Sequence, residues 1–205
     1  KKCFIVAELS ANHNGKLLNL LKMIRKAKLA GADAVKIQAY EADGITMKSN
    51  KKYFRLQSKS KWKKYNNLYD LYKKAQTPKK WYKKIFDYAK KIEIKVFASV
   101  FDLETLKFLE KNVNCQIYKI ASPEIIDIPL LKEVAKTGKT VIVSNGLANF
   151  EDLKLAVKTI TKYHKNFVIL KCTSSYPAPI ESLNLSTIND IRKKFKCLVG
   201  FSDHT

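Results

Sequence analysis

Short apolar segments alternate with amphipathic segments along almost the whole chain. Seven of the apolar segments have the length of a β-strand, and they cover residues 3–9, 32–39, 94–100, 116–121, 140–144, 167–172 and 197–201. They are nearly continuous in hydrophobic character and often β-branched, as expected for parallel strands that are covered on both faces. The pattern therefore predicts an α/β fold with seven parallel strands.

The segments between these strands carry helical periodicity and helix end signals. Apolar residues recur at helical spacing over residues 17–29, and a glycine follows as a stop signal. Asp102 and Asn149 each precede a further amphipathic run and are suited to cap it. Pro129 opens another helix, which closes at Gly138. Neither a linker nor a low-complexity segment divides the chain, so we expect one domain.

Two architectures fit seven strands of this kind: an open doubly wound sheet and a TIM (β/α)8 barrel. A doubly wound sheet usually carries a GxGxxG loop after its first strand, but residues 9–15 read LSANHNG. Polar residues instead lie at or near the carboxyl end of every predicted strand, as the active-site face of a barrel requires. These residues are Glu8, Lys36, Gln38, Ser99, Lys119, Ser122, Ser144, Thr173, Ser174, Asp203 and His204. The pattern favours the barrel, and since a barrel closes with eight strands, we expect strand eight to lie outside this chain.

The formal net charge of +22 raises the question of nucleic-acid binding. Only three of the 40 basic residues are arginine, so the bidentate group that reads guanine and grips phosphate is nearly absent. The lysines occur along every predicted helix, where their stems ordinarily cover the core. Residues 59–91 interleave lysine with tryptophan and tyrosine, and a lysine-rich nucleic-acid-binding barrel stays open as the alternative to an enzyme.

The cysteines and the hydropathy indicate the compartment. The four cysteines show no CxxC spacing and three lie in apolar runs, which is typical of reduced thiols in a cytoplasmic protein. No apolar stretch approaches the ~20 residues of a membrane span. Residues 3–9 are too few for the apolar core of a signal sequence. We therefore expect a soluble cytoplasmic protein.

Two lysines and one glutamate stand within the apolar strand segments. A lysine inside a buried strand is costly unless an anion meets it. Lys36 and Lys119 together favour a phosphate or carboxylate ligand, although either could instead pair with a core carboxylate such as Glu8. Glu8 itself could act as a general acid or base, or form a structural ion pair with Lys36.

Histidine gives a weaker signal. His204 lies at the end of the last predicted strand, beside Asp203, in a position suited to a catalytic metal. One histidine is not a site by itself, because open catalytic metal sites use two or three protein ligands. His13, in the first loop, could contact a substrate or cap the following helix. The sequence contains neither a GxSxG elbow nor a cysteine in a Cys–His context, so it gives no sign of a nucleophilic enzyme.

Five motifs, in this order, resemble the sialic-acid synthase family over the whole chain. Residues 7–15 read AELSANHNG, 31–38 read GADAVKIQ, 118–122 read YKIAS, 172–179 read CTSSYPAP and 200–205 read GFSDHT. The first and fourth motifs are similar to the pseudaminic acid synthase branch of the family rather than to the N-acetylneuraminate branch.

The resemblance implies a reaction and a set of site residues. A TIM barrel would condense phosphoenolpyruvate with a 2,4-diacetamido-2,4,6-trideoxy hexose, in its open-chain form, to a nonulosonic acid and phosphate. Glu8 would handle the proton of the water that adds to C2. The implied substrate-binding residues are Lys36, Gln38, Ser99, Lys119, Ser122, Ser144, Ser174 and Tyr176, with Tyr176 on the sugar side. An N-acetylneuraminate or legionaminate synthase is the alternative within the family.

The resemblance also implies parts that residues 1–205 do not supply. His204 would be one of two histidine ligands of a divalent metal, Mn²⁺ foremost with Mg²⁺ or Co²⁺ as substitutes, which polarises the sugar aldehyde. The second histidine belongs on strand eight, and a C-terminal antifreeze-like domain reaches over the partner's barrel in a homodimer. Residues 1–205 are therefore expected to be an incomplete catalytic domain, inactive alone.

Five positions depart from the branch. Pro123 and Ile126 stand where an aromatic residue and a threonine are usual, and Val100 stands where a proline is usual. Asn145 and Leu147 replace a threonine and a methionine. These departures bear on the fit of the substrate and not on the reaction class.

Overall fold

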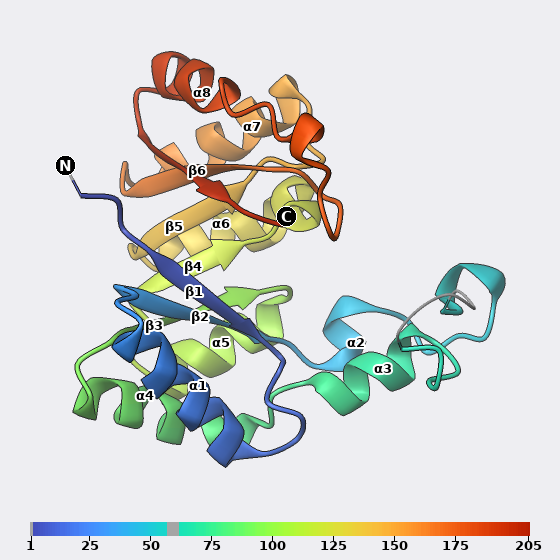
Figure 1. The fold of residues 1–205 in the computed structure, drawn as a ribbon. Coiled ribbons are helices and arrows are strands. Elements are labelled where there is room, and N and C mark those ends of the chain that lie inside the picture. The colour runs from blue at the N-terminus through green and yellow to red at the C-terminus, as the bar shows by residue number, and fades with distance from the viewer. Residues whose placement is uncertain (1, 57–61) are drawn as a thin grey trace. The chain divides into compact units, whose positions relative to one another are not determined.

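The computed structural model describes residues 2–56 and 62–205, which form two compact units, Lys1–Cys115 and Gln116–Thr205 (Figure 1). In each unit the strands run parallel to their neighbours and alternate with helices. The predicted α/β class is confirmed. The predicted segment 59–91 falls partly outside the described residues.

The first unit holds three parallel strands in the order β1 (Val6–Ser10), β2 (Ala34–Ala39) and β3 (Lys95–Val100). Buried residues of the long helices, among them Leu20, Ile24 and Ile85, form the core with the strands. The helices are α1 (Leu17–Leu29), α2 (Ala42–Ile45), α3 (Leu68–Ala75), α4 (Tyr82–Lys91) and α5 (Leu103–Asn112), with short 3-10 turns η1 (Lys52–Phe54) and η2 (Lys79–Trp81). Helices α2 and α3 lie to the side of this core (Figure 1).

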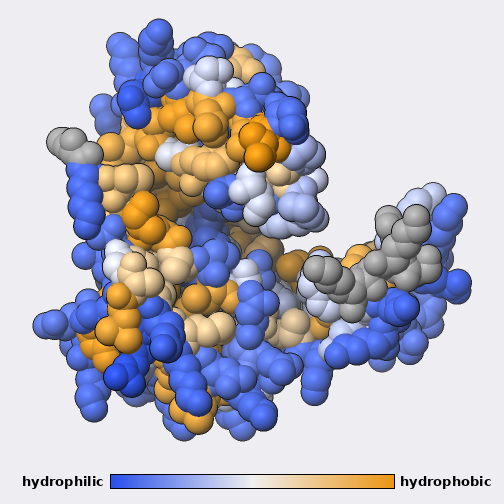
Figure 2. All heavy atoms as spheres, viewed as in Figure 1, coloured by the Kyte–Doolittle hydropathy of each residue, from blue (hydrophilic) through white to orange (hydrophobic). Residues whose placement is uncertain are grey.

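The second unit holds four parallel strands in the order β4 (Ile117–Ile120), β5 (Thr140–Ser144), β6 (Phe167–Cys172) and β7 (Leu198–Ser202). Its helices are α6 (Ile128–Lys136), α7 (Phe150–Thr161) and α8 (Thr187–Phe195), with 3-10 turns η3 (Pro123–Ile126) and η4 (Ile180–Ser182). Hydrophobic surface gathers over β6 and β7 of this unit (Figure 2), where Leu198 is 73% exposed.

The strand order decides between the two architectures considered from the sequence. A doubly wound sheet reverses its strand order at a switch point. In both units the strands instead follow one another in sequence order, as in a (β/α) barrel. The fold is therefore a TIM-barrel-like α/β fold, and the absence of strand eight stays a prediction.

Sheet register places the polar strand residues of each unit on one face. In the first unit Glu8 pairs with Lys36, and Gln38 pairs with Ser99. Alternate residues of a strand share a face, so these four side chains lie on the same side. In the second unit Lys119 pairs with Ile142, Ser144 pairs with Leu170 and Cys172 pairs with Ser202. The opposite face of this unit carries the fully buried residues Tyr118, Ile120, Val141, Val143 and Ile169.

The aromatic residues of the lysine-rich segment mostly pack onto the first unit. Tyr82 is buried, Trp81 contacts His13 edge-on, and Tyr72 contacts Tyr40. Tyr69 donates a hydrogen bond to Asp43, at 3.2 Å. These rings do not form an open row onto which bases could stack. Among the described residues, no helix combines the length and the apolar character needed to cross a membrane.

Candidate functional site

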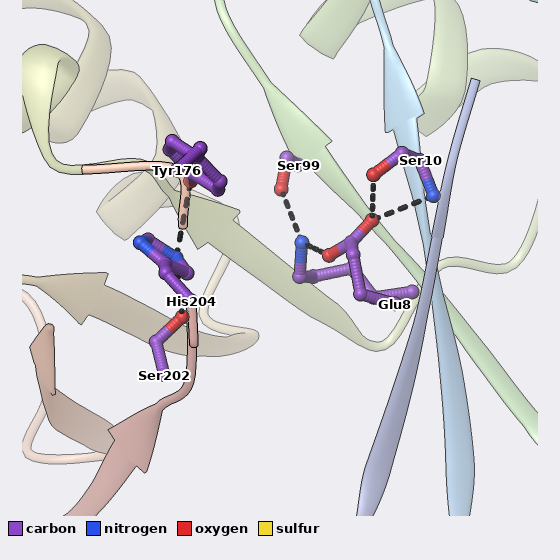
Figure 3. A network of polar contacts seen from close by, with 7 residues as sticks. Glu8, Ser10, Ser99, Tyr176, Ser202 and His204 are labelled. Atoms are coloured by element: carbon purple, nitrogen blue, oxygen red, sulfur yellow. Dashed lines mark hydrogen bonds and ion pairs between the residues drawn. The ribbon is translucent and has the colours of Figure 1, made fainter. Parts of the chain in front are cut away.

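A charged group lies at the carboxyl ends of the strands of the first unit (Figure 3). Glu8 of β1 forms an ion pair with Lys36 of β2 through its Oε2 atom. The Lys36 ammonium also donates to the hydroxyl of Ser99 on β3, at 3.2 Å. The structural ion pair considered from the sequence is therefore present. The Glu8 side chain is 40% exposed, so the same carboxylate is open to a ligand.

Ser10 holds the second oxygen of Glu8. Its backbone N–H donates to Glu8 Oε1 at 2.7 Å, and its hydroxyl donates to the same atom at 3.1 Å. Ser10 adopts a positive φ of 50°, and the β1–β2 register shifts between Glu8 and Ser10. This local bend brings both donors onto the carboxylate and fixes its orientation.

His13 is a structural residue of the first loop. Its side chain is fully buried, and its Nδ1 atom accepts the backbone N–H of Gly15 at 3.1 Å. Nε2 therefore carries the hydrogen and donates to the Thr77 hydroxyl at 3.2 Å. Burial lowers the pKa of His13, which favours this neutral form. Because the side chain of His13 has no exposed surface, it cannot contact a substrate, and one of the two roles considered from the sequence is excluded.

Lys119, in the middle of β4, has quite different surroundings from Lys36. Only 5% of the residue is exposed, and burial lowers its pKa to about 8. Electrostatic interactions with Cys172 and Glu124 act in the opposite direction. Across residues 2–56 and 62–205, no hydrogen bond or ion pair reaches the Lys119 ammonium. A buried cation of this kind is suited to bind an anion.

Hydroxyl and thiol groups converge beside Gly146, in the loop after β5. A Cβ atom at this glycine would lie 2.9 Å from Ser122 Oγ and 2.6 Å from Cys172 Sγ, and would collide with Ser174 Oγ. Ser122 accepts the backbone N–H of Leu147 at 2.7 Å and keeps a hydroxyl hydrogen to donate. Gly146 therefore packs directly against two of the predicted site residues, Ser122 and Ser174, and against Cys172.

The hydroxyl of Ser144 is buried without a hydrogen-bond partner among the described residues. The residue is 1% exposed. Ser144 lies on the same face as Lys119, on the neighbouring strand. Since buried polar groups are normally paired, an anion beside Lys119 would give this hydroxyl its partner.

Glu124 is a site residue that the sequence reasoning missed. It lies on η3, and burial raises its pKa, while the charge of Lys119 lowers it. Its Oε2 atom is buried and has no hydrogen-bond partner among the described residues. The sequence feature that could have identified Glu124 is its position, two residues after Ser122 and just beyond a predicted strand.

His204 and Tyr176 form a second group in the Gln116–Thr205 unit (Figure 3). His204 Nδ1 lies 2.7 Å from the carbonyl oxygen of Thr173, so it carries a hydrogen and donates it. Nε2 is then an acceptor, 3.1 Å from the hydroxyl of Tyr176 and 3.3 Å from that of Ser202. The two rings stack with centroids 4.2 Å apart. A backbone carbonyl, and not Asp203, orients this imidazole.

Comparison with known proteins identifies the family. Residues 23–205 match the NeuB family. The chain belongs to the NeuB family. It is 45% identical, over its whole length, to the pseudaminic acid synthase of Campylobacter jejuni serotype O:2, and 40% identical over 98% of its length to that of Helicobacter pylori. It covers 59% and 58% of these relatives, about three fifths of their length.

A solved structure of the family supports the fold. The N-acetylneuraminic acid synthetase of Leptospira borgpetersenii superposes on the whole chain with a TM-score of 0.86 at 34% identity. The chain covers 66% of that protein. The resemblance to the sialic-acid synthase family is thus confirmed, and both units take part in it.

This chain supplies one candidate metal ligand, the imidazole of His204. His204 fits that role, because metal-binding histidines usually donate their other N–H to a carbonyl or carboxylate, as it does to Thr173. The described residues contain no group of three or more histidine, cysteine, aspartate or glutamate side chains that could hold an ion. His204 alone would hold an ion weakly.

The last predicted residues to place are Gln38, Ser174 and Tyr176. Gln38 is half-buried and lies beside Ser99 in the sheet. Ser174 and Tyr176 are exposed, in the loop after β6. Burial of its ring and the nearby Cys172 raise the pKa of Tyr176, so its hydroxyl stays protonated and can donate.

Proposed function

We propose that the chain is the substrate-binding part of a pseudaminic acid synthase. The observation that carries the proposal is the 45% identity to the Campylobacter jejuni enzyme along the whole chain. The reaction joins phosphoenolpyruvate to a 2,4-diacetamido-2,4,6-trideoxy hexose and releases phosphate. Because the chain spans 59% of that relative, the proposed activity belongs to the full-length protein, as a homodimer, and residues 1–205 alone are expected to be inactive.

The second unit would bind the phosphate and carboxylate of phosphoenolpyruvate. Lys119 supplies a buried, unpaired cation, and Ser144 supplies an unpaired hydroxyl on the same face. Ser122 and Ser174 meet at Gly146, and their hydroxyls would donate to the anion. Charge-assisted hydrogen bonds of this kind are among the strongest that proteins form. In the first unit, Lys36 with Ser99 would offer a cation to an anionic ligand.

Two carboxyl groups would handle protons. Glu8, which accepts hydrogen bonds from Ser10 and pairs with Lys36, would take the proton of the water that adds to C2 of phosphoenolpyruvate. Glu124, whose pKa is raised by burial, retains its proton to higher pH than usual. It can give that proton to the oxygen of the sugar aldehyde as C3 attacks the carbonyl carbon.

His204, Tyr176 and Gln38 would serve the sugar end. His204 would be one ligand of a divalent metal, with further ligands from the rest of the protein. The metal, when bound, would polarise the sugar aldehyde. Tyr176 stacks on His204, and its exposed ring can contact the apolar face of a deoxy sugar. Ile126 and Leu147, both 65% exposed, would set the fit of the acylamino groups.

The test uses the full-length protein and three sugars. Phosphate release from phosphoenolpyruvate is measured with the diacetamido-trideoxy hexose, with the corresponding legionaminate precursor and with N-acetylmannosamine. We expect kcat/KM for the first sugar to exceed that for N-acetylmannosamine by roughly a hundredfold, because buried polar groups would be left unpaired by the wrong sugar. A preference for either other sugar would contradict the proposal and assign the alternative synthase.

A further inference from the structure

The Nε2 atom of His204 already accepts hydrogen bonds from neighbouring side chains (Figure 3). The other ring nitrogen, Nδ1, donates to the carbonyl oxygen of Thr173 at 2.7 Å, so the ring hydrogen lies on Nδ1 and the lone pair on Nε2. The hydroxyl of Tyr176 lies 3.1 Å from Nε2, and that of Ser202 lies 3.3 Å from it. A neutral imidazole offers one acceptor nitrogen, and a metal ion binds through the same lone pair.

The imidazole is held in place by contacts that do not involve the Tyr176 hydroxyl. Besides the bond from Nδ1 to Thr173, the backbone carbonyl of His204 accepts the N–H of Ala178 at 2.7 Å. The Thr173 hydroxyl in turn donates to the carbonyl oxygen of Ser182 at 3.0 Å, which ties the loop after β6 together. We therefore expect His204 to keep its orientation when the phenol leaves it.

The ring of Tyr176 can leave the imidazole at low cost. Its face stacks on His204 with the ring centroids 4.2 Å apart and an angle of 24° between the planes. The residue is nevertheless 78% exposed, so turning it away uncovers little buried apolar surface. Tyr176 thus combines a direct contact to the acceptor nitrogen with the freedom to break that contact.

We propose that the Tyr176 hydroxyl and a divalent metal ion compete for Nε2 of His204, so that metal binding releases this hydroxyl to the sugar substrate. The inference rests on the proposed function, in which His204 is a metal ligand. Nε2 cannot accept the phenol's hydrogen bond and bind an ion at the same time. The released hydroxyl can donate to the carbonyl oxygen of an acylamino group or accept from a sugar hydroxyl.

Cooperative binding of the ion and the sugar follows from this competition. The sugar needs the phenol that the ion sets free, so each ligand should raise the affinity of the other by the same factor. If Tyr176 instead supported the ion, for example by orienting a water molecule on it, loss of the hydroxyl would weaken metal binding. The two roles of Tyr176 therefore predict changes of opposite sign.

The first experiment measures Mn²⁺ affinity in the full-length protein without substrates. Tyr176→Phe keeps the stacked ring and removes only the hydroxyl. We expect Mn²⁺ to bind about twofold to tenfold more tightly to this variant in a calorimetric titration, as the loss of one competing hydrogen bond predicts. Ser202→Ala should give a smaller gain, because its hydroxyl lies farther from Nε2. The matched control is Tyr163→Phe, since Tyr163 lies before the amino end of β6 and should not affect the ion.

The second experiment observes the release of the hydroxyl. Addition of Mn²⁺ should change the near-ultraviolet absorption of tyrosine in the wild type, because one phenol loses its acceptor, and this change should vanish in Tyr176→Phe. The diacetamido-trideoxy hexose should raise Mn²⁺ affinity more in the wild type than in Tyr176→Phe. An equal effect of the sugar on both proteins would overturn the release of the hydroxyl to the sugar.

The outcomes separate this inference from the proposed function. Mn²⁺ affinity that is unchanged or lower in Tyr176→Phe, while His204→Ala loses the ion, would overturn the competition and leave His204 as the metal ligand. Mn²⁺ binding that His204→Ala does not weaken would contradict the proposed metal role and the inference together.

Discussion

The two strand lysines are alike in sequence and different in structure. Both stand in apolar runs, so the sequence predicts that each needs an anionic partner. Lys36 finds Glu8, which lies 28 positions away, whereas Lys119 finds no such partner in the described chain. The sequence could not separate the two cases, because the partners come from other strands and depend on register. The unpaired lysine is the one that we propose as the anion site.

The charge of Lys119 should show in the pH dependence of stability. Its pKa falls from 10.5 to about 8 in the folded protein, so the unfolded chain binds more protons between these values. Stability therefore rises with pH across that window, and the buried charge costs about 3 kcal/mol below it. We expect full-length Lys119→Met to be more stable than wild type by roughly this amount near neutral pH, with the difference shrinking as the pH approaches 10.5. Urea unfolding of both proteins across the pH range measures it, and a difference that does not change with pH would contradict the assignment.

Gly146 should be needed for anion binding. In Gly146→Ala the new methyl group would collide with the side chains of Ser174, Cys172 and Ser122, so the two serines proposed as donors would be displaced. We expect stabilisation by phosphoenolpyruvate to be lost. The matched control is Gly200→Ala, whose methyl group meets only the end of the flexible Leu170 side chain, 2.8 Å away. The rise in melting temperature on addition of phosphoenolpyruvate is measured for both variants. A wild-type rise in Gly146→Ala would show that the ligand binds elsewhere.

At the level of elements, the sequence predicted what local chemistry determines. The strands 140–144 and 167–172 appear with the expected bounds, and the other strands differ by a few residues at their ends. Helix α1 spans the expected 17–29. Helices α2 and α3 and the 3-10 turns were not predicted, because they are short. The same reason hid Glu124, which a 3-10 turn brings beside Lys119.

The predicted caps form, and one of them provides a test. Asn149 accepts the backbone N–H of Asp152 at 2.9 Å, and Asp152 accepts that of Asn149 at 3.0 Å, which makes a capping box on α7. Asn149→Ala should therefore cost about 1 kcal/mol of unfolding free energy, with little change in activity. Ser186 at the start of α8 makes no side-chain cap, so Ser186→Ala is the matched control with a smaller effect. Equal losses in urea unfolding of the two variants would contradict the role of the capping box.

At the level of the whole molecule, the sequence predicted the fold class and the family. Polar residues at every strand end indicated a barrel-type site, and the strand order within each unit agrees with a TIM-barrel-like fold. Periodicity could not predict the convergence of Ser122, Cys172 and Ser174 on Gly146, because it depends on loop conformation. The chain matches the NeuB family over residues 23–205.

Metal binding is a property we expect only of the full-length protein. His204 offers one imidazole with its Nδ1–H bound to Thr173, and Mn²⁺ needs several ligands. His204→Ala in the full-length protein should weaken Mn²⁺ binding at least about tenfold. The matched control is His164→Ala, because His164 lies before the amino end of β6 and should not affect the ion. Equal Mn²⁺ affinity of wild type and His204→Ala in a calorimetric titration would contradict the proposed role of His204 as a metal ligand.

The measurement that tests the central claim most directly is sugar-dependent phosphate release by full-length wild type and Lys119→Met. The wild type should release phosphate from phosphoenolpyruvate only when the diacetamido-trideoxy hexose is present. The variant should fold, yet its kcat/KM for phosphoenolpyruvate should fall by at least about a thousandfold, because it lacks the buried cation that meets the anion. No phosphate release with any of the three sugars, or a Lys119→Met protein with wild-type kcat/KM, would contradict the account.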